Sequence, residues 1–367
     1  MKLYILLVVL SAGITYVMTA IMRRLSLEWH VLTPVRERDV HTVPTPRLGG
    51  VAMALGFAIT LLFASQLEYF GPVFAENTPW AVMGGVLAIA ALGLVDDIWE
   101  LDWMAKMAGQ ILVAVFMAYN GVQLITFPIF GITIGSSTLS LVVTIFVFVA
   151  IMNAVNFVDG LDGLAAGVVG IGAFSFFVYS YMLTRVTGAL TYATTSSLLV
   201  AILVGICVGF LPHNFHPASI FMGDSGALTL GTLVAAAGII VTGQIDPSVL
   251  GTEQVITAFL PILLPLLVIV IPLVDMTLAV VRRLRAGKSP FQADRLHLHH
   301  RLLNLGHTHM GVVLIMYLWT AVITIPAVAL IAYSPRQVAT VALPAVLISI
   351  VLTIRFLPGL RKKLQRN

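Results

Sequence analysis

Long apolar stretches recur along this chain, and they constrain its fold more than any other feature. Windows of about 19 residues, the length that crosses the hydrocarbon core of a bilayer, identify candidate spans. The eleven spans have the limits 3–22, 48–66, 79–95, 107–125, 140–157, 164–183, 193–212, 226–242, 256–281, 310–332 and 338–357. The sequence therefore predicts an all-α, polytopic integral membrane protein with about eleven transmembrane helices, formed as one membrane-embedded domain over residues 1–367.

The composition supports this class and excludes several others. Only 10% of the 367 residues are charged and 59% are apolar, whereas a soluble domain carries roughly 25% charged residues. The single cysteine, Cys207, excludes an intrachain disulfide and a cysteine-based metal site. A net charge of +4 is too small to indicate a nucleic-acid partner.

Basic residues are divided unevenly between alternate loops. Seventeen of the 20 Lys and Arg residues fall on one side of the predicted topology, and the other side holds Lys2, Arg185 and Arg336. The positive-inside rule places the N-terminus outside and the C-terminus in the cytoplasm, and an odd number of spans requires that parity. Arg23-Arg24 follows the first span without a small-residue cleavage site, so we expect a retained helix.

Polar residues whose side chains could act in catalysis or bind a ligand gather at the predicted cytoplasmic ends of the spans. A transporter would place ionisable groups near the bilayer midplane, and a non-catalytic scaffold would not need them in several separate loops. The pattern therefore favours an enzyme that works at the inner membrane surface. Its active site is predicted in the loops 23–47, 96–106, 153–164, 213–226 and 282–309.

An acidic pair, Asp96-Asp97, ends the third predicted span, and Lys106 follows nine residues after Asp97. Adjacent carboxylates on a helix point to different faces, so we expect them to have two different partners. Taken alone, the pair is a weak signal, because such a pair is more often a solvated helix end.

Four amide and carboxyl side chains recur at intervals of three residues: Asn153, Asn156, Asp159 and Asp162. On a helix this spacing makes one polar stripe. Gly160 and Gly163 predict that the helix ends near Asp159 and that the stripe continues into a turn. Oxygen ligands gathered in this way suit Mg²⁺.

The segment 213–226 carries Asn214 and Asp224 just before the eighth predicted span. Asp224 fits an ordinary helix N-cap. The same position also offers backbone N–H groups and a positive dipole end to a phosphate.

A basic, histidine-rich segment lies between the ninth and tenth predicted spans. Its spacing is not that of a helical zinc pair, so anionic phosphates are the expected ligands. Attraction of a solvated basic loop to anionic lipid is the alternative. The residues that carry this interpretation are Arg295, His297, His299 and His300.

Together these motifs resemble a known family. Their order matches that found in the polyprenyl-phosphate N-acetylhexosamine-1-phosphate transferases of glycosyltransferase family 4. The segments that carry the resemblance are Pro44–Gly50, Asp96-Asp97, Asn153–Leu164, Phe221–Gly226 and Asp294–His300. The last segment resembles the WecA/TagO branch, because the related MraY branch usually shows a different histidine-rich sequence there.

The resemblance implies transfer of N-acetylhexosamine-1-phosphate, first of all GlcNAc-1-phosphate, from a UDP-sugar to undecaprenyl phosphate with release of UMP. This step would initiate lipid-linked cell-envelope glycan synthesis at the cytoplasmic face of a bacterial inner membrane. Mg²⁺ is the implied cofactor, with Mn²⁺ as a substitute, and membrane lipids and a second copy of the chain are the implied partners. The identity of the hexosamine, the downstream glycan and the choice between one step and a covalent intermediate stay open.

The resemblance also assigns roles to individual residues. The implied catalytic carboxylates are Asp96, Asp97, Asp159 and Asp162, with Asp162 towards the uridine, and the implied Mg²⁺ ligands are Asp224 and Asn156. The implied substrate-binding residues are Asn153, Lys106, Arg47, Asn214, Arg295, His297, His299 and His300. Asp275, near the end of the ninth span, binds substrate or is satisfied by a neighbouring arginine, and a structural role is favoured.

Overall fold

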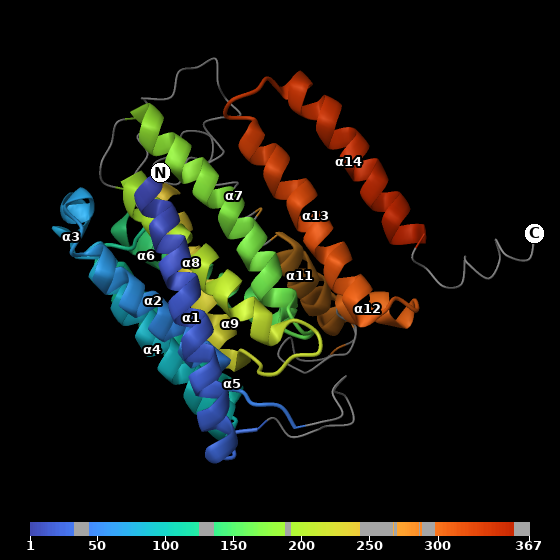
Figure 1. Cartoon of the computed structure of the whole chain (residues 1–367), viewed down its shortest axis with the longest axis horizontal. Helices are drawn as coiled ribbons and strands as arrows, with labels where there is room; N and C mark the ends of the chain where they lie inside the picture. Colours follow the sequence, from blue (N-terminus) through green and yellow to red (C-terminus); the bar gives the residue numbers. More distant parts are fainter. Residues whose placement is uncertain are drawn as a thin grey trace, which may run out of the picture.

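The structure is a computed structural model that describes residues 1–32, 44–124, 136–187, 192–242, 270–285 and 298–355, with Leu267 and Gly287. Every regular element in these ranges is a helix, which confirms the all-α class (Figure 1). In chain order they are α1 (Lys2–Glu28), α2 (Gly49–Ala64), η1 (Glu68–Phe70), α3 (Gly71–Phe74), α4 (Thr78–Trp99), α5 (Trp103–Tyr119), α6 (Ser137–Val158), α7 (Leu164–Thr187), α8 (Tyr192–Asn214), α9 (Gly223–Thr242), α11 (Val270–Arg285), α12 (Leu298–Asn304), α13 (His309–Ala329) and α14 (Pro335–Arg355).

Eight of the described helices are long and apolar enough to cross a membrane: α1, α4, α6, α7, α8, α9, α13 and α14. A ninth candidate is α2 followed by η1 and α3, with a bend of 95° between the two parts, and α5 is apolar but shorter. The polytopic membrane class is therefore confirmed. The count of eleven spans and the orientation of the termini stay predictions, because much of the predicted span 256–281 lies outside the described residues.

Helix α9 is the most enclosed element of the bundle. All of its side chains except that of Asp224 are buried, and it packs against α2, α4, α6 and α8. Small residues let the neighbouring helices approach closely: a Cβ atom on Gly231 would lie 2.6 Å from the Cα atom of Met152 in α6. Because its neighbours enclose α9, its first turn has a fixed position relative to the ends of α4 and α6.

The segment before α2 is held against the segment before α9 by backbone hydrogen bonds. The N–H groups of Gly49 and Gly50 donate to the carbonyl oxygens of Phe221 (3.0 Å) and Met222 (2.9 Å), and Phe221 N–H donates to Pro46 (2.8 Å). A side chain at Gly50 would collide with the backbone of α9, since its Cβ would lie 2.0 Å from the nitrogen of Gly226. Two motifs about 175 residues apart in the chain thus become neighbours.

A second, smaller hydrophobic core joins α12 and α13 to the end of α6 and the start of α7. Its buried residues are Val158, Leu161, Leu164, Val168, Leu302, Val312, Val313, Ile315 and Met316. In Figure 1 α12 lies beside the first turn of α13, and α14 runs along the outer side of α13. This core encloses the turn in which Asp159 and Asp162 lie.

Candidate active site

Asp97, near the end of α4, is the hub of the acidic cluster. Its fully buried carboxylate accepts the backbone N–H groups of Asp224 (2.9 Å) and Ser225 (3.1 Å), the first residues of α9 after Gly223. It also forms an ion pair with the Nε atom of Arg47 at 3.1 Å. Backbone N–H groups in the first turn of a helix have no partner within the helix, so Asp97 caps α9 from another helix.

Gly223 explains how the carboxylate comes so close to this turn. Its φ is +64°, in the left-handed region that glycine adopts readily. An added Cβ would lie 2.4 Å from an oxygen of Asp97. A glycine is therefore required at this position both by the backbone conformation and by the space.

Asp96 has a different set of partners from Asp97, as the sequence predicted for adjacent carboxylates on one helix. One oxygen accepts the backbone N–H of Leu101 at 2.8 Å, just after α4 ends. The other lies 2.9 Å from the Nζ atom of Lys106 in α5. Asp96 thereby ties the short connection between α4 and α5 to the site.

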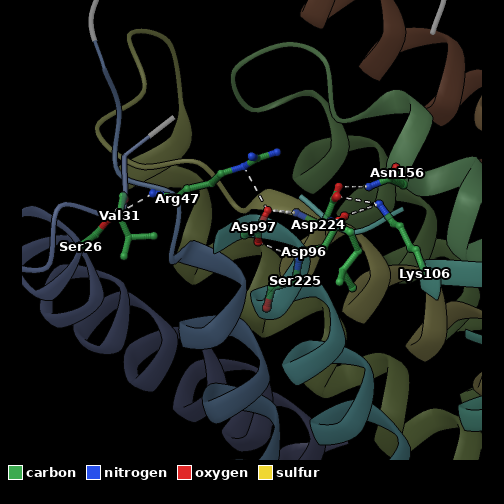
Figure 2. Close-up of polar contacts among 10 residues, drawn as sticks. Ser26, Val31, Arg47, Asp96, Asp97, Lys106, Asn156, Asp224 and Ser225 are labelled. Carbon is green, nitrogen blue, oxygen red and sulfur yellow. Dashed lines mark hydrogen bonds and ion pairs between the residues drawn. The ribbon is translucent and has the colours of Figure 1, made fainter. Parts of the chain in front are cut away.

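Asp224 receives the other contacts of the cluster, as Figure 2 shows. Its Oδ2 atom lies 2.6 Å from the Nζ atom of Lys106, and its Oδ1 atom accepts a hydrogen bond of 2.5 Å from the side-chain amide of Asn156 in α6. The interpretation of Asp224 as a simple N-cap is wrong, because Asp97 supplies the cap of α9. The Asp224 side chain faces the cluster instead.

Asp159 follows directly after α6, which ends at Val158 as the glycines predicted. Burial raises the pKa of its carboxyl group from the ordinary 3.8 to about 7, and the negative charge of Asp224 adds to the shift. The positive charge of Arg47 opposes it. A carboxyl group with a pKa near neutrality can hold or release a proton under physiological conditions.

Asp162 is buried and pins two loops together, which is a different environment from that of the acidic cluster. Its Oδ2 atom accepts the backbone N–H of Ala218 at 3.1 Å and lies 2.7 Å from the Nδ1 atom of His216. Its own N–H donates to Nε2 of His309 at 3.0 Å. The structure thus connects the turn after α6 to the segment before α9 and to the start of α13.

Asp162, His216 and His309 bring one ligand atom each within 4.8 Å of one another. The geometry does not suit a metal ion, however. The two imidazole rings are stacked, with centroids 4.3 Å apart and an angle of 16° between their planes, whereas the ligand nitrogens of two histidines must both point at a shared ion. The three residues form a hydrogen-bonded stack.

Two residues predicted to bind substrate have side-chain contacts within the protein. Asn214 is buried; its amide oxygen accepts the N–H of Gly163 (3.0 Å) and its amide nitrogen donates to the carbonyl of Ile220 (3.0 Å). Asn153 lies one helical turn before Asn156 and donates to Oε1 of Gln110 at 2.6 Å. These hydrogen bonds hold both side chains in place, and their implied substrate-binding roles stay predictions.

The basic segment is described only in part. Arg295 and His297 lie outside the described residues, and so do the side chains of His299 and His300, whose backbone forms the start of α12. Their implied roles stay predictions.

Sequence reasoning missed Gln110 and His309. Gln110 is four residues after Lys106, so it lies on the same face of α5 one turn deeper in the bundle, and it is fully buried. The i, i+4 spacing of two polar residues in an apolar helix was the available signal. For His309, which is far from Asp162 in sequence, only the packing of α13 reveals the contact.

Comparison with known proteins gives a consistent result over nearly the whole chain. The model of the family described as glycosyl transferase family 4 matches residues 79–242. The decaprenyl-phosphate N-acetylglucosaminephosphotransferase of Mycolicibacterium smegmatis is similar to the chain, with 42% identity over 358 residues, 96% of this chain and 87% of that protein.

More distant relatives carry related names. A protein of Bacillus subtilis named as a probable undecaprenyl-phosphate N-acetylglucosaminyl 1-phosphate transferase is 31% identical, over 86% of this chain and 81% of its own length. A phospho-N-acetylmuramoyl-pentapeptide-transferase of Desulforudis audaxviator is 29% identical, over 85% of this chain and 94% of its own length.

Proposed function

Because this chain belongs to glycosyl transferase family 4, we propose that it transfers N-acetylglucosamine-1-phosphate from UDP-N-acetylglucosamine to a polyprenyl phosphate and releases UMP. The sequence predicted undecaprenyl phosphate as the acceptor. The relative at 42% identity is named for decaprenyl phosphate and the one at 31% for undecaprenyl phosphate. The proposal therefore extends to both lipids, which share the phosphate group that reacts.

The observation that carries the proposal is the convergence of carboxylates from three separate segments on two cations. Ion pairs and hydrogen bonds join Asp96, Asp97, Asp224, Arg47 and Lys106, and Asp159 lies within electrostatic range of Asp224 and Arg47. When these six residues are ionised their formal charge is −2, which one divalent cation neutralises. Their hard oxygen donors, together with the amide of Asn156, fit Mg²⁺, and Mn²⁺ accepts the same donors.

Asp224 and Asn156 would hold the ion. Asp96 lies next to them, because Lys106 forms ion pairs with both Asp96 and Asp224. Bound there, Mg²⁺ would neutralise charge on the diphosphate of the nucleotide sugar. The protein supplies further positive charge, since Lys106 and Arg47 reach the cluster from α5 and from the segment before α2 (Figure 2). Phosphoryl transfer depends mainly on such positioning and charge neutralisation.

In the proposed reaction an oxygen of the lipid phosphate attacks the phosphorus that carries the sugar. The bond from that phosphorus to the bridging oxygen breaks, and its electron pair leaves with UMP. Asp159, in the turn after α6 and within electrostatic range of Asp224 and Arg47, is the proposed acceptor of a proton from the lipid phosphate. Asp97 is less suited, because three donors already occupy its carboxylate; it holds Arg47 and the first turn of α9 in place.

We further propose that the site faces the cytoplasm of a bacterium from its inner membrane. Support comes from the 17 basic residues on one side of the predicted topology, which place the N-terminus outside and the C-terminus inside. The nucleotide sugar is soluble in the cytoplasm, and the lipid phosphate is held at the membrane surface. A site at the helix ends can receive both.

The test uses the purified chain in detergent with UDP-[³H]GlcNAc, Mg²⁺ and either decaprenyl or undecaprenyl phosphate. We expect label in the lipid phase and an equal amount of UMP, both lost on addition of EDTA and restored by Mg²⁺ or Mn²⁺. The matched control is Ser65→Ala, because Ser65 lies at the end of α2, and its hydrogen bonds among the described residues are with Leu62 and Gln66. Absence of labelled lipid with both acceptors, from protein that is monodisperse and thermally cooperative, would refute the proposal.

A further inference from the structure

The buried face of α11 carries charges, which is unusual for a helix in an apolar bundle. Pro272, Asp275, Ala279 and Arg283 are its buried residues, and their spacing puts them on one stripe. The exposed residues of the same helix include Val274, Leu278 and Leu284. A buried charge is costly when it lacks a partner, so we ask which groups Asp275 and Arg283 contact.

Asp275 accepts a hydrogen bond from the first residue of α12. Its Oδ1 atom lies 2.7 Å from the backbone nitrogen of Leu298. Asp275 as a whole is 4% exposed. A helix begins with N–H groups that have no partner within the helix, and an ionised acceptor makes the stronger kind of hydrogen bond. Asp275 therefore fixes the position at which α12 starts.

The other end of α12 is fixed by apolar packing. Leu302 is buried in the second core with Val158 and Leu161, which flank Asp159 in the turn after α6. Leu298 packs against the same core. The two contacts together orient a seven-residue helix next to the turn that carries the acidic residues.

Helix α11 is itself anchored to the last turn of α6, just before Asp159. It packs against α6, and the guanidinium carbon of buried Arg283 lies 5.7 Å from the ring centroid of Phe157, between Asn156 and Val158. Such a cation–π contact is stronger when the cation is shielded from water. Helix α11 thus contacts the end of α6 through Arg283 and α12 through Asp275.

We propose that Asp275 is a positioning residue: its hydrogen bond to Leu298 N–H holds α12, and with it His299 and His300, in the register that the transfer reaction needs. The inference rests on the proposed function. It assigns no substrate contact to Asp275 and proposes that Asp275 acts through the backbone of α12.

The experiment compares Asp275→Leu, Asp275→Asn and the control Thr277→Ala in the full chain. Asparagine keeps an oxygen acceptor for Leu298 N–H and leucine does not. Thr277 is exposed on α11, and among the described residues its hydroxyl donates to the carbonyl oxygen of Leu273 in the same helix. We expect kcat to fall at least tenfold in Asp275→Leu with KM for the nucleotide sugar within threefold, and to stay within threefold in the other two variants.

A double-mutant cycle tests whether Asp275 affects the reaction through α12. If Asp275 acts through α12, Asp275→Leu should cause little further loss of kcat, at most twofold, in a His299→Ala/His300→Ala background. A full tenfold additional loss would show that Asp275 acts elsewhere and would overturn the proposal. An equal loss of kcat in Asp275→Asn and Asp275→Leu would do the same, because it would make the charge and not the acceptor the important property.

Hydrogen exchange gives a readout that does not depend on catalysis. Amides of Leu298–Asn304 should exchange at least tenfold faster in Asp275→Leu than in wild type, and unchanged in Asp275→Asn and Thr277→Ala. Unchanged exchange in Asp275→Leu would contradict the proposal that Asp275 holds α12, even if activity fell. If wild type made no lipid-linked product, the proposed function would fail, whereas the exchange result would still decide whether Asp275 holds α12.

Discussion

The acidic cluster around Asp224 and the stack around Asp162 use the same residue type for opposite purposes. In the stack, the Asp162 carboxylate joins loops by binding Ala218 N–H and His216. In the cluster, Asp97 performs that joining task for α9, which leaves the Asp224 side chain facing Lys106 and Asn156. In the cluster, the structural task of Asp97 is what leaves the Asp224 side chain available to face other polar groups.

The largest effect on activity is expected at Asp224. Asp224→Asn removes a negative charge from the cluster but leaves the cap of α9 intact, because Asp97 supplies that cap. Loss of one charged group from a preorganised site typically costs ~10²–10³-fold in turnover. We expect a loss of that size in kcat with the thermal midpoint within about 2 °C of wild type. Activity within twofold of wild type at limiting Mg²⁺ would contradict the assignment.

Asp97→Ala should reduce stability as well as activity, and this sharpens the comparison with Asp224. The change leaves two buried N–H groups and Arg47 without their acceptor, and loss of a helix cap costs roughly 1–2 kcal/mol. A lower thermal midpoint in detergent and a loss of activity of at least tenfold are expected. A variant that is inactive but as stable as wild type would show that Asp97 acts in the chemistry and not as the cap.

Asp162→Ala tests whether the stack is a structural pin. The predicted catalytic role requires activity to fall as far as in Asp224→Asn, whereas a pin predicts a smaller loss, about tenfold, with a lowered thermal midpoint. His216→Phe, which keeps a ring against His309 but loses the hydrogen bond to Asp162, should show part of the same loss of stability. Equal activity losses in Asp162→Ala and Asp224→Asn, without destabilisation, would restore the catalytic role.

The smallest effect is the pH dependence of stability contributed by Asp159. Its folded-state pKa is about 7 and its ordinary value is 3.8. Between these values the unfolded chain has lost the proton and the folded chain keeps it, so the free energy of unfolding falls as pH rises towards 7 and then levels off. In buffer with EDTA, Asp159→Asn should therefore be more stable than wild type at pH 8, with little difference at pH 4.

Thermal unfolding of both proteins across this range measures the effect. A stability difference between wild type and Asp159→Asn that is constant with pH would show that the Asp159 carboxyl group keeps an ordinary pKa in the folded protein. Added Mg²⁺ should reduce this stability difference at pH 8, since the ionised carboxylates would then face a cation.

The sequence by itself determined the membrane class, the helical architecture and the residue types of the site. Apolar runs of membrane length, the glycines that end α6 and the adjacent acids of α4 each act locally, so their consequences follow from spacing alone. The different partners of Asp96 and Asp97 were predicted for this reason.

Tertiary structure decided which polar residues face the site and which support it. Asp97 and Asp224 are 127 residues apart, and no local rule indicates that one caps the helix of the other. Asn214, Asn153 and Asp162 are predicted to bind substrate or to act in catalysis, and only the structure shows that each also makes hydrogen bonds to distant segments of the protein. The physical reason is that buried polar groups must find partners, and only the packing of α9, α11 and α13 determines which partners are within reach.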